Sequence, residues 1–87
     1  MALKEDFAKA VGDVKALNKR PSNDELLQLY ALFKQASDGD VKGDRPGMFD
    51  LKGRAKFDAW GKLKGKTSDD CMNGYLTLVY GLKRKYN

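Results

Sequence analysis

Residues 30–60 read YALFKQASDGDVKGDRPGMFDLKGRAKFDAW, two helical segments joined by a long connection. The connection runs from about Asp38 to Phe49 and contains three glycines and Pro46, which interrupt helical periodicity. Ordered connections of this length are uncommon in a compact domain and are often functional. We therefore expect a functional loop between two helices.

Apolar residues at three- and four-residue spacings predict four helices along the chain. Ser22 and Glu25 form a capping box, Asp50 caps the third helix, and Gly65 ends it. The predicted helices run from Leu3 to Leu17, from Ser22 to Ala36 or Ser37, from Leu51 to Leu63 or Lys64, and from Ser68 to Lys85. No strand-like alternation competes with them, so we expect an all-α, four-helix bundle forming one domain over residues 1–87.

The charge is unevenly distributed along the chain. The net charge is +5, but residues 1–44 hold seven Lys/Arg against eight Asp/Glu, whereas residues 45–87 hold ten against four. A basic half indicates a polyanionic partner such as a nucleic acid, a phosphorylated ligand or an anionic lipid. The simpler alternative is a solvated face rich in lysine.

Length and cysteine content limit the compartment and the kind of site. Cys71 is the one cysteine, so no disulfide forms within the chain, which suits a reducing compartment. The N-terminus lacks the apolar core of a secretory signal, and no apolar run could cross a bilayer. We expect a soluble cytoplasmic protein whose 87 residues form a surface groove or shallow bowl rather than a large interior cavity.

Two cations lie inside apolar helical stripes. In the second helix, apolar residues spread over about 220° of the helix circumference, and Lys34 lies among them, next to Phe33 and one turn after Tyr30. In the third helix, Lys56 lies among alanines on the face that holds Trp60. Either the lysines extend to water, or they form a phosphate site beside rings that stack on a base. The wide apolar arc likewise fits a central helix, a ligand-facing helix, or both.

Several common catalytic and metal-binding arrangements are missing from the sequence. The chain contains no histidine, which excludes Ser-His and Cys-His pairs and histidine metal ligands. A single cysteine cannot build a zinc site, and no phosphate-binding glycine motif follows a predicted strand. We expect neither an enzyme nor a metal or other cofactor.

In its motifs, the chain resembles the acyl-CoA-binding protein family over essentially its whole length. The matching segments are Tyr30–Ala36, Gly39-Asp40, Arg45–Met48, Lys52–Trp60 and Gly74-Tyr75, in the order and spacing of the family. The resemblance implies an up-down-down-up four-helix bundle with a long connection between helices 2 and 3. It also implies a monomer that binds and carries a long-chain fatty acyl-CoA, in transient contact with membranes or acyl-CoA-using enzymes.

The resemblance also implies roles for single residues. Lys56 would pair with the ribose 3′-phosphate of CoA, and Tyr30 and Lys34 would flank that phosphate and the adenine. Phe33 would stack near the adenine. The remaining contacts would come from Lys15 and Lys52 to the CoA head, from the Tyr75 hydroxyl to the ligand, and from Val11, Leu26 and Leu27 to the acyl chain.

Four positions depart from the family pattern. Phe33 replaces the usual Tyr, which keeps the ring and loses the hydroxyl. Arg20 replaces a common Lys, which keeps the charge and changes its geometry. Val11 replaces a smaller residue and would narrow the acyl path, while Gly74 weakens a helix by about 1 kcal/mol relative to Ala.

Two other functions remain open from the residues alone. A small basic nucleic-acid-binding domain is compatible with the charge, but the cations are not concentrated on one recognition helix. A helical module that binds proteins or the membrane surface is the second alternative. We favour the acyl-CoA carrier, with no nucleic acid among its partners.

Overall fold

The computed structural model describes residues 2–86 and contains four α-helices over that range. They are α1 (Leu3–Lys15), α2 (Asn23–Asp38), α3 (Leu51–Gly61) and α4 (Ser68–Tyr86). No residue between 2 and 86 belongs to a β-strand. The predicted all-α class is confirmed, and all four expected helices are present.

The predicted capping groups begin α2 and α3. The Ser22 hydroxyl accepts a hydrogen bond from the Glu25 backbone N–H at 3.2 Å, and the Glu25 carboxylate accepts one from the Ser22 N–H at 2.8 Å. The Asp50 carboxylate accepts one from the Gly53 N–H at 2.9 Å. These side chains accept hydrogen bonds from backbone N–H groups that have no partner within the helix.

Two helices are shorter than predicted. α1 ends at Lys15 instead of Leu17, and α3 ends at Gly61 instead of Leu63 or Lys64. The N–H groups of Leu17 and Leu63 donate to carbonyls three residues earlier, at 3.4 and 3.0 Å. The last turn of each apolar stripe is therefore tighter than an α-helical turn, as is common at helix ends.

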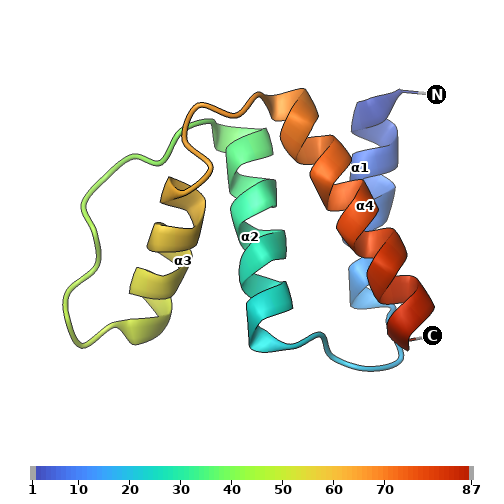
Figure 1. The fold of residues 1–87 in the computed structure, drawn as a ribbon, viewed down its shortest axis with the longest axis horizontal. Helices are drawn as coiled ribbons and strands as arrows, with labels where there is room; N and C mark the ends of the chain where they lie inside the picture. The colour runs from blue at the N-terminus through green and yellow to red at the C-terminus, as the bar shows by residue number, and fades with distance from the viewer. Residues whose placement is uncertain (1, 87) are drawn as a thin grey trace.

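The long connection sets the direction of the helices. In Figure 1 the chain runs down α1, up α2, up α3 and down α4, which confirms the up-down-down-up topology. Residues 39–50 connect two parallel helices and must return along the length of α2. Twelve extended residues reach about 40 Å, which exceeds the ~24 Å of a 16-residue helix.

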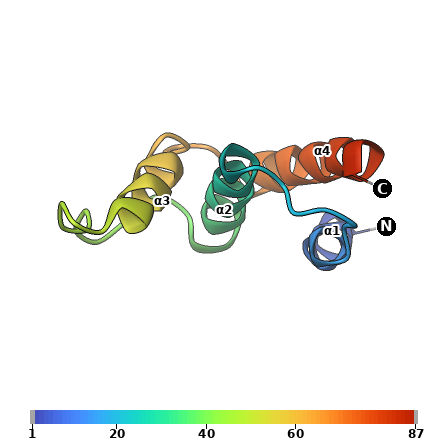
Figure 2. The same ribbon diagram turned by 90° about the horizontal axis from the view of Figure 1, so that it is seen from below.

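The bundle is flat and open at one side. α4 packs against both α1 and α2, whereas α3 packs against α2 alone among the described helices. Figure 2 shows α3, α2 and α4 side by side, with α1 on one side of α4. The Cα atoms extend over 37 × 28 × 15 Å, so the bundle is less than half as thick as it is long. One face of α3 therefore remains open to ligands or partners.

The core lies between α1, α2 and α4. Gly74 of α4 belongs to this interface, because a Cβ atom there would lie 3.3 Å from Leu32 Cδ2. Close approach of the two helices thus explains a glycine that weakens helix propensity. The buried core residues are Phe7, Ala10, Leu29, Ala36, Cys71, Met72, Tyr75, Val79 and Leu82.

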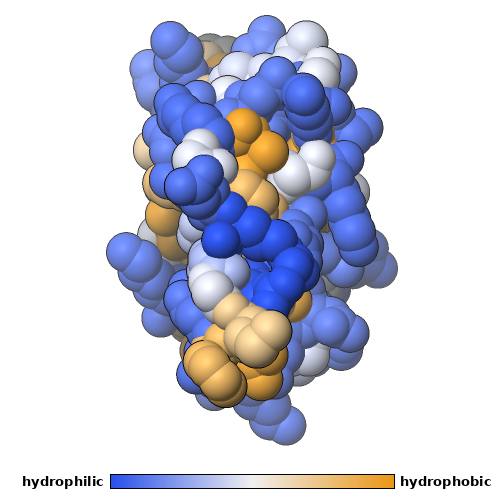
Figure 3. All heavy atoms as spheres, turned by 90° about the vertical axis from the view of Figure 1, so that its left-hand side faces the viewer, coloured by the Kyte–Doolittle hydropathy of each residue, from blue (hydrophilic) through white to orange (hydrophobic). Residues whose placement is uncertain are grey.

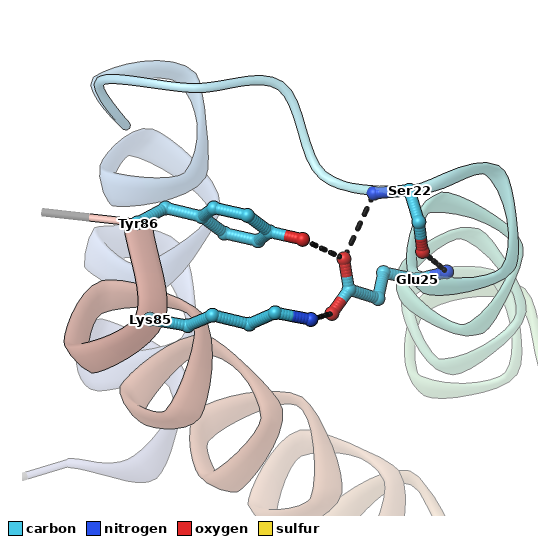
Figure 4. A network of polar contacts seen from close by, with 4 residues as sticks. All are labelled: Ser22, Glu25, Lys85 and Tyr86. Atoms are coloured by element: carbon cyan, nitrogen blue, oxygen red, sulfur yellow. Dashed lines mark hydrogen bonds and ion pairs between the residues drawn. The ribbon is translucent and has the colours of Figure 1, made fainter.

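A polar network joins the end of α4 to the start of α2 (Figure 4). The Glu25 carboxylate accepts hydrogen bonds from the Tyr86 hydroxyl at 2.8 Å and from Lys85 Nζ at 3.1 Å, in addition to the Ser22 N–H. The Ser22 N–H contributes most to lowering the pKa of Glu25 to about 2, followed by Tyr86. Glu25 is therefore a structural carboxylate that orients α2.

Polar contacts also fasten the long connection to α3. Trp60 Nε1 donates to the Gly39 carbonyl at 2.8 Å. Arg45 donates two hydrogen bonds to the Asp58 carboxylate, at 2.9 and 2.8 Å. This bidentate pair holds the pKa of Asp58 below its usual range. The connection is thus ordered, and it holds α3 in register with α2.

Candidate functional site

A hollow of about 640 Å³ opens between α2, α3 and the segment before α2. Its apolar surface comes from Leu26 and Leu27 of α2 and Ala55 of α3. Three cations and no carboxylate line it, which makes it attractive to an anion that carries an apolar group. The complete lining is Arg20, Asn23, Leu26, Leu27, Tyr30, Lys52, Ala55 and Lys56.

Helical spacing places these side chains on facing surfaces. Leu27 and Tyr30 are three residues apart on α2, and Lys52 and Lys56 are four residues apart on α3, so each pair shares one helix face. Because α2 and α3 are parallel and packed together, the two faces meet across the hollow.

Lys56 lies over an aromatic ring at this site. Its Nζ is 5.3 Å from the centre of the Tyr30 ring, a cation–π distance. Within residues 2–86, neither Lys56 nor Lys52 forms an ion pair with a carboxylate. Both ammonium groups are therefore available to a phosphate without first breaking an internal pair.

Lys34 occupies a different environment. Its ammonium group pairs with the Asp38 carboxylate one turn later and lies 4.9 Å from the centre of the Trp60 ring. The hydrogen bond that Lys34 donates to the Asp38 carboxylate raises the pKa of Lys34, and the same contact lowers the pKa of Asp38. Lys34 does not line the hollow. To bind a ligand phosphate, the Lys34 ammonium group would have to leave the Asp38 carboxylate.

Phe33 and Tyr75 belong to an aromatic cluster that joins three helices. The Phe33 ring of α2 stacks on Phe7 of α1 at 5.9 Å, and Phe7 meets Tyr75 of α4 edge-on at 5.0 Å. Phe33 remains 39% exposed, whereas Tyr75 is 4% exposed and its burial raises its pKa. The structure therefore places these two residues outside the lining of the hollow.

The remaining predicted residues are divided between the hollow and α1. Lys15 is exposed in the last turn of α1 and does not line the hollow, and Val11 is half-buried against the core. Leu26 and Leu27, expected beside an acyl chain, do line it. The structure brings together Tyr30, Lys52 and Lys56 among the seven predicted polar and aromatic site residues.

Asn23 and Ala55 line the hollow without having been predicted as site residues, and Arg20 was expected only as a departure from the family pattern. Arg20 lies just before α2, and its guanidinium donates to the Asn23 side chain at 3.4 Å. Asn23 precedes Leu26, Leu27 and Tyr30 at helical spacing, a pattern that could have identified it. Ala55 has no comparable signal, because a small residue between two lysines is common on any helix.

A second, smaller hollow of about 430 Å³ adjoins the first along the same two helices. Leu27 lines both hollows, and Ala31, Leu32, Ala59 and Leu63 give the second a largely apolar surface. Among the residues that the structure describes, Leu27 is the one that contributes to the lining of both hollows.

Reactive and metal-binding groups are scarce in the described part of the chain. Among residues 2–86 no group of three or more His, Cys, Asp or Glu side chains is arranged to hold a metal ion. Cys71 is 1% exposed, and burial raises the pKa of its thiol, which disfavours the nucleophilic thiolate. No helix formed by the described residues has the length and apolar content needed to span a membrane.

Known proteins match the chain over nearly its full length. Residues 4–79 match the family model described as Acyl CoA binding protein. An acyl-CoA-binding protein homolog of Drosophila melanogaster is 57% identical over 82 residues, covering 94% of this chain and 95% of the relative. Homolog 1 of Caenorhabditis elegans is 55% identical over 80 residues, covering 92% and 93%. The crystal structure of Oryza sativa acyl-CoA-binding protein 2 superposes with a TM-score of 0.91 at 41% identity, covering 95% of this chain and 90% of that one.

Proposed function

This chain belongs to the acyl-CoA-binding protein family, and from that membership we propose that it binds a long-chain fatty acyl-CoA and carries it without catalysis. The observation that carries the proposal is Lys56, unpaired with any described carboxylate and 5.3 Å from the Tyr30 ring, beside an apolar hollow. This combination fits a ligand with a phosphate, an aromatic base and a hydrocarbon chain. Acyl-CoA has all three.

We assign the CoA head to the cationic side of the hollow. Lys56 would pair with the ribose 3′-phosphate, and Lys52 would contact the other phosphates. Tyr30 would lie against the adenine, where base stacking contributes ~1–3 kcal/mol. Arg20 adds a third cation at the same hollow and extends the site beyond the residues predicted.

Four further residues are proposed as contacts at the edge of this site. Phe33 has an exposed ring that can stack, and Lys34 can reach a phosphate if it leaves Asp38. Lys15 would reach the head group from α1. Tyr75 would act through its hydroxyl, although its burial leaves little surface for the ligand.

The acyl chain supplies most of the binding energy. Burying about 14 methylenes at ~0.8 kcal/mol each contributes about 11 kcal/mol before the cost of association is subtracted. Leu26 and Leu27 line the hollow on α2, and Val11 is a half-buried apolar residue of α1, so we propose these three as the acyl-chain contacts. The acyl chain would supply most of the binding affinity, and the phosphate contacts would supply most of the ligand discrimination.

We propose a carrier role with no cofactor beyond the ligand itself. The lack of histidine in the sequence and the burial of Cys71 support a non-catalytic function. A carrier must also load and unload its ligand, so transient contact with membranes or acyl-CoA-using enzymes belongs to the proposal. We propose a cytoplasmic monomer, because a lone cysteine suits a reducing compartment and the hollow is lined by residues of a single chain.

The test is a titration of the purified protein, by calorimetry and native mass spectrometry, with palmitoyl-CoA, free CoA and a DNA duplex. We expect one palmitoyl-CoA per chain, with free CoA bound orders of magnitude more weakly because it has no chain to bury. Equal affinities for CoA and palmitoyl-CoA would contradict burial of the tail. Tight binding of the duplex at physiological salt, without palmitoyl-CoA binding, would favour the nucleic-acid alternative instead.

A further inference from the structure

Three large apolar side chains lie in solvent where the long connection meets α3. Met48, Phe49 and Leu51 are 68%, 95% and 74% exposed, and we call them the apolar tip. Figure 3 faces α3 and the long connection, and it shows a hydrophobic cluster at the lower end of this face, surrounded mainly by hydrophilic atoms. None of the three residues lines either hollow or packs on the core. Neither the fold nor the acyl-CoA site accounts for their exposure.

Hydrogen bonds hold the apolar tip in one shape. The Asp50 N–H donates to the Gly47 carbonyl at 2.9 Å and closes a turn with Met48 and Phe49 at its centre. The Asp50 carboxylate is engaged by the Gly53 N–H, so the one acid in this turn faces the helix. A surface that is already ordered loses less conformational entropy on binding than a mobile loop does.

The part of α3 that follows the apolar tip is positively charged. Lys52, Arg54 and Lys56 form no ion pair within residues 2–86, whereas Arg45, before the tip, is paired with Asp58, and the turn itself carries Asp50. Lys52 directly follows Leu51, is exposed and has no ion-pair partner within residues 2–86. Apolar side chains beside unpaired cations are the combination by which proteins bind the interface of an anionic bilayer.

We propose that the apolar tip inserts into the interface of an anionic phospholipid bilayer while the cations beside it contact the lipid headgroups. A stable protein interface needs about 800 Å² per partner, more than three side chains at the end of a turn provide. A second copy of the chain would bring an equal positive charge to the same place. An anionic membrane has the charge opposite to that of this surface, and it accommodates a small projecting tip.

The apolar tip lies beside the larger hollow. The purpose that we assign to the membrane contact rests on the proposed carrier function. Lys52 lines the larger hollow and is adjacent to Leu51, so a docked protein would hold the rim of the hollow at the membrane surface. Fatty acyl-CoA is itself amphipathic and partitions into that surface. Docking would therefore shorten the path of the ligand between bilayer and hollow.

The test is co-sedimentation of the ligand-free protein with vesicles of phosphatidylcholine, with and without about 20% phosphatidylserine. We expect the wild type to bind the anionic vesicles and to dissociate as salt is raised, because salt screens the headgroup contacts. Phe49→Asp should lower the partition coefficient at least about tenfold, equivalent to 1.4 kcal/mol. Tyr80→Asp is the matched control, because Tyr80 is an aromatic residue of α4 that is 59% exposed and lies outside the apolar tip.

A second variant reports insertion directly. Phe49→Trp should show a blue-shifted emission on anionic vesicles and quenching by brominated acyl chains, while Trp60, which is 7% exposed, gives an unchanged background. Absence of wild-type binding, equal binding of Phe49→Asp and wild type, or a lack of quenching in the Phe49→Trp variant would each overturn the proposal. So would sedimentation equilibrium that shows a wild-type dimer dissociated by Phe49→Asp, since the apolar tip would then bind a second copy.

Titration of palmitoyl-CoA separates this proposal from the proposed function. Phe49→Asp should keep the wild-type dissociation constant, because Phe49 is outside the hollow. If vesicle binding fails and palmitoyl-CoA still binds, only the membrane contact is overturned. If vesicles bind and palmitoyl-CoA does not, the proposed function fails and the membrane surface stands.

Discussion

Removal of the Lys56 ammonium group is the sharpest test of the site. Lys56 is the cation that the structure leaves unpaired with any described carboxylate and places over the Tyr30 ring, so Lys56→Ala removes one charge without exposing an internal partner. Hydrogen bonds to charged groups contribute ~1.5–3 kcal/mol, roughly 10- to 150-fold in affinity. Because Lys56 is exposed and its contact is partly screened by water, we expect a loss near the lower limit, about 10- to 30-fold.

Calorimetry with two ligands tells whether that loss belongs to the 3′-phosphate. Palmitoyl-CoA and palmitoyl-dephospho-CoA differ only in this phosphate, so Lys56→Ala should weaken the first much more than the second. Lys4→Ala, an exposed lysine of α1, changes the net charge equally and should leave both dissociation constants unchanged. Equal losses for the two ligands in Lys56→Ala would refute the pairing of Lys56 with the 3′-phosphate.

Three further changes test the rest of the site and its support. Phe33→Ala should weaken palmitoyl-CoA binding by the ~1–3 kcal/mol of one stacked base; an unchanged dissociation constant would remove this ring from the site. Asp38→Asn frees Lys34 from its pair and should strengthen binding up to about fivefold, whereas weaker binding would mean that the pair holds Lys34 in place for the ligand. Glu25→Gln should lower the melting temperature at neutral pH. The folded-state pKa of Glu25, about 2, lies below the unfolded value, so its stabilisation is present above about pH 4.3 and is lost as pH falls towards 2. A difference in melting temperature as large at pH 2 as at neutral pH would show that the charge of Glu25 is not its cause.

The helices and their order follow closely from local sequence. Ser22 and Glu25 identify the start of α2 because a capping box acts within four residues, and Asp50 does the same for α3. The two ends that were predicted too late, at Leu17 and Leu63, are places where an apolar stripe continues through a tighter turn. Periodicity records which residues are buried and does not distinguish an α-helical turn from a 3₁₀ turn.

The partners of the cations were only partly predictable. Lys34 and Lys56 look alike in sequence, since each is a lysine in an apolar stripe, yet one pairs with Asp38 and the other lies over Tyr30. The first partner is one helical turn away in the same helix. The second is on another helix and reaches Lys56 only because the long connection makes α2 and α3 parallel.

Local sequence determined the four helices, the basic charge of the second half and the presence of unusual lysines, because capping, periodicity and charge act over a few residues. Tertiary structure decided which side chains share a surface. It placed Tyr30 with Lys56 and Arg20, gave Phe33 and Tyr75 a common neighbour in Phe7, and left the apolar tip uncovered. These outcomes depend on the packing of helices far apart in the chain, and no spacing within one helix encodes them.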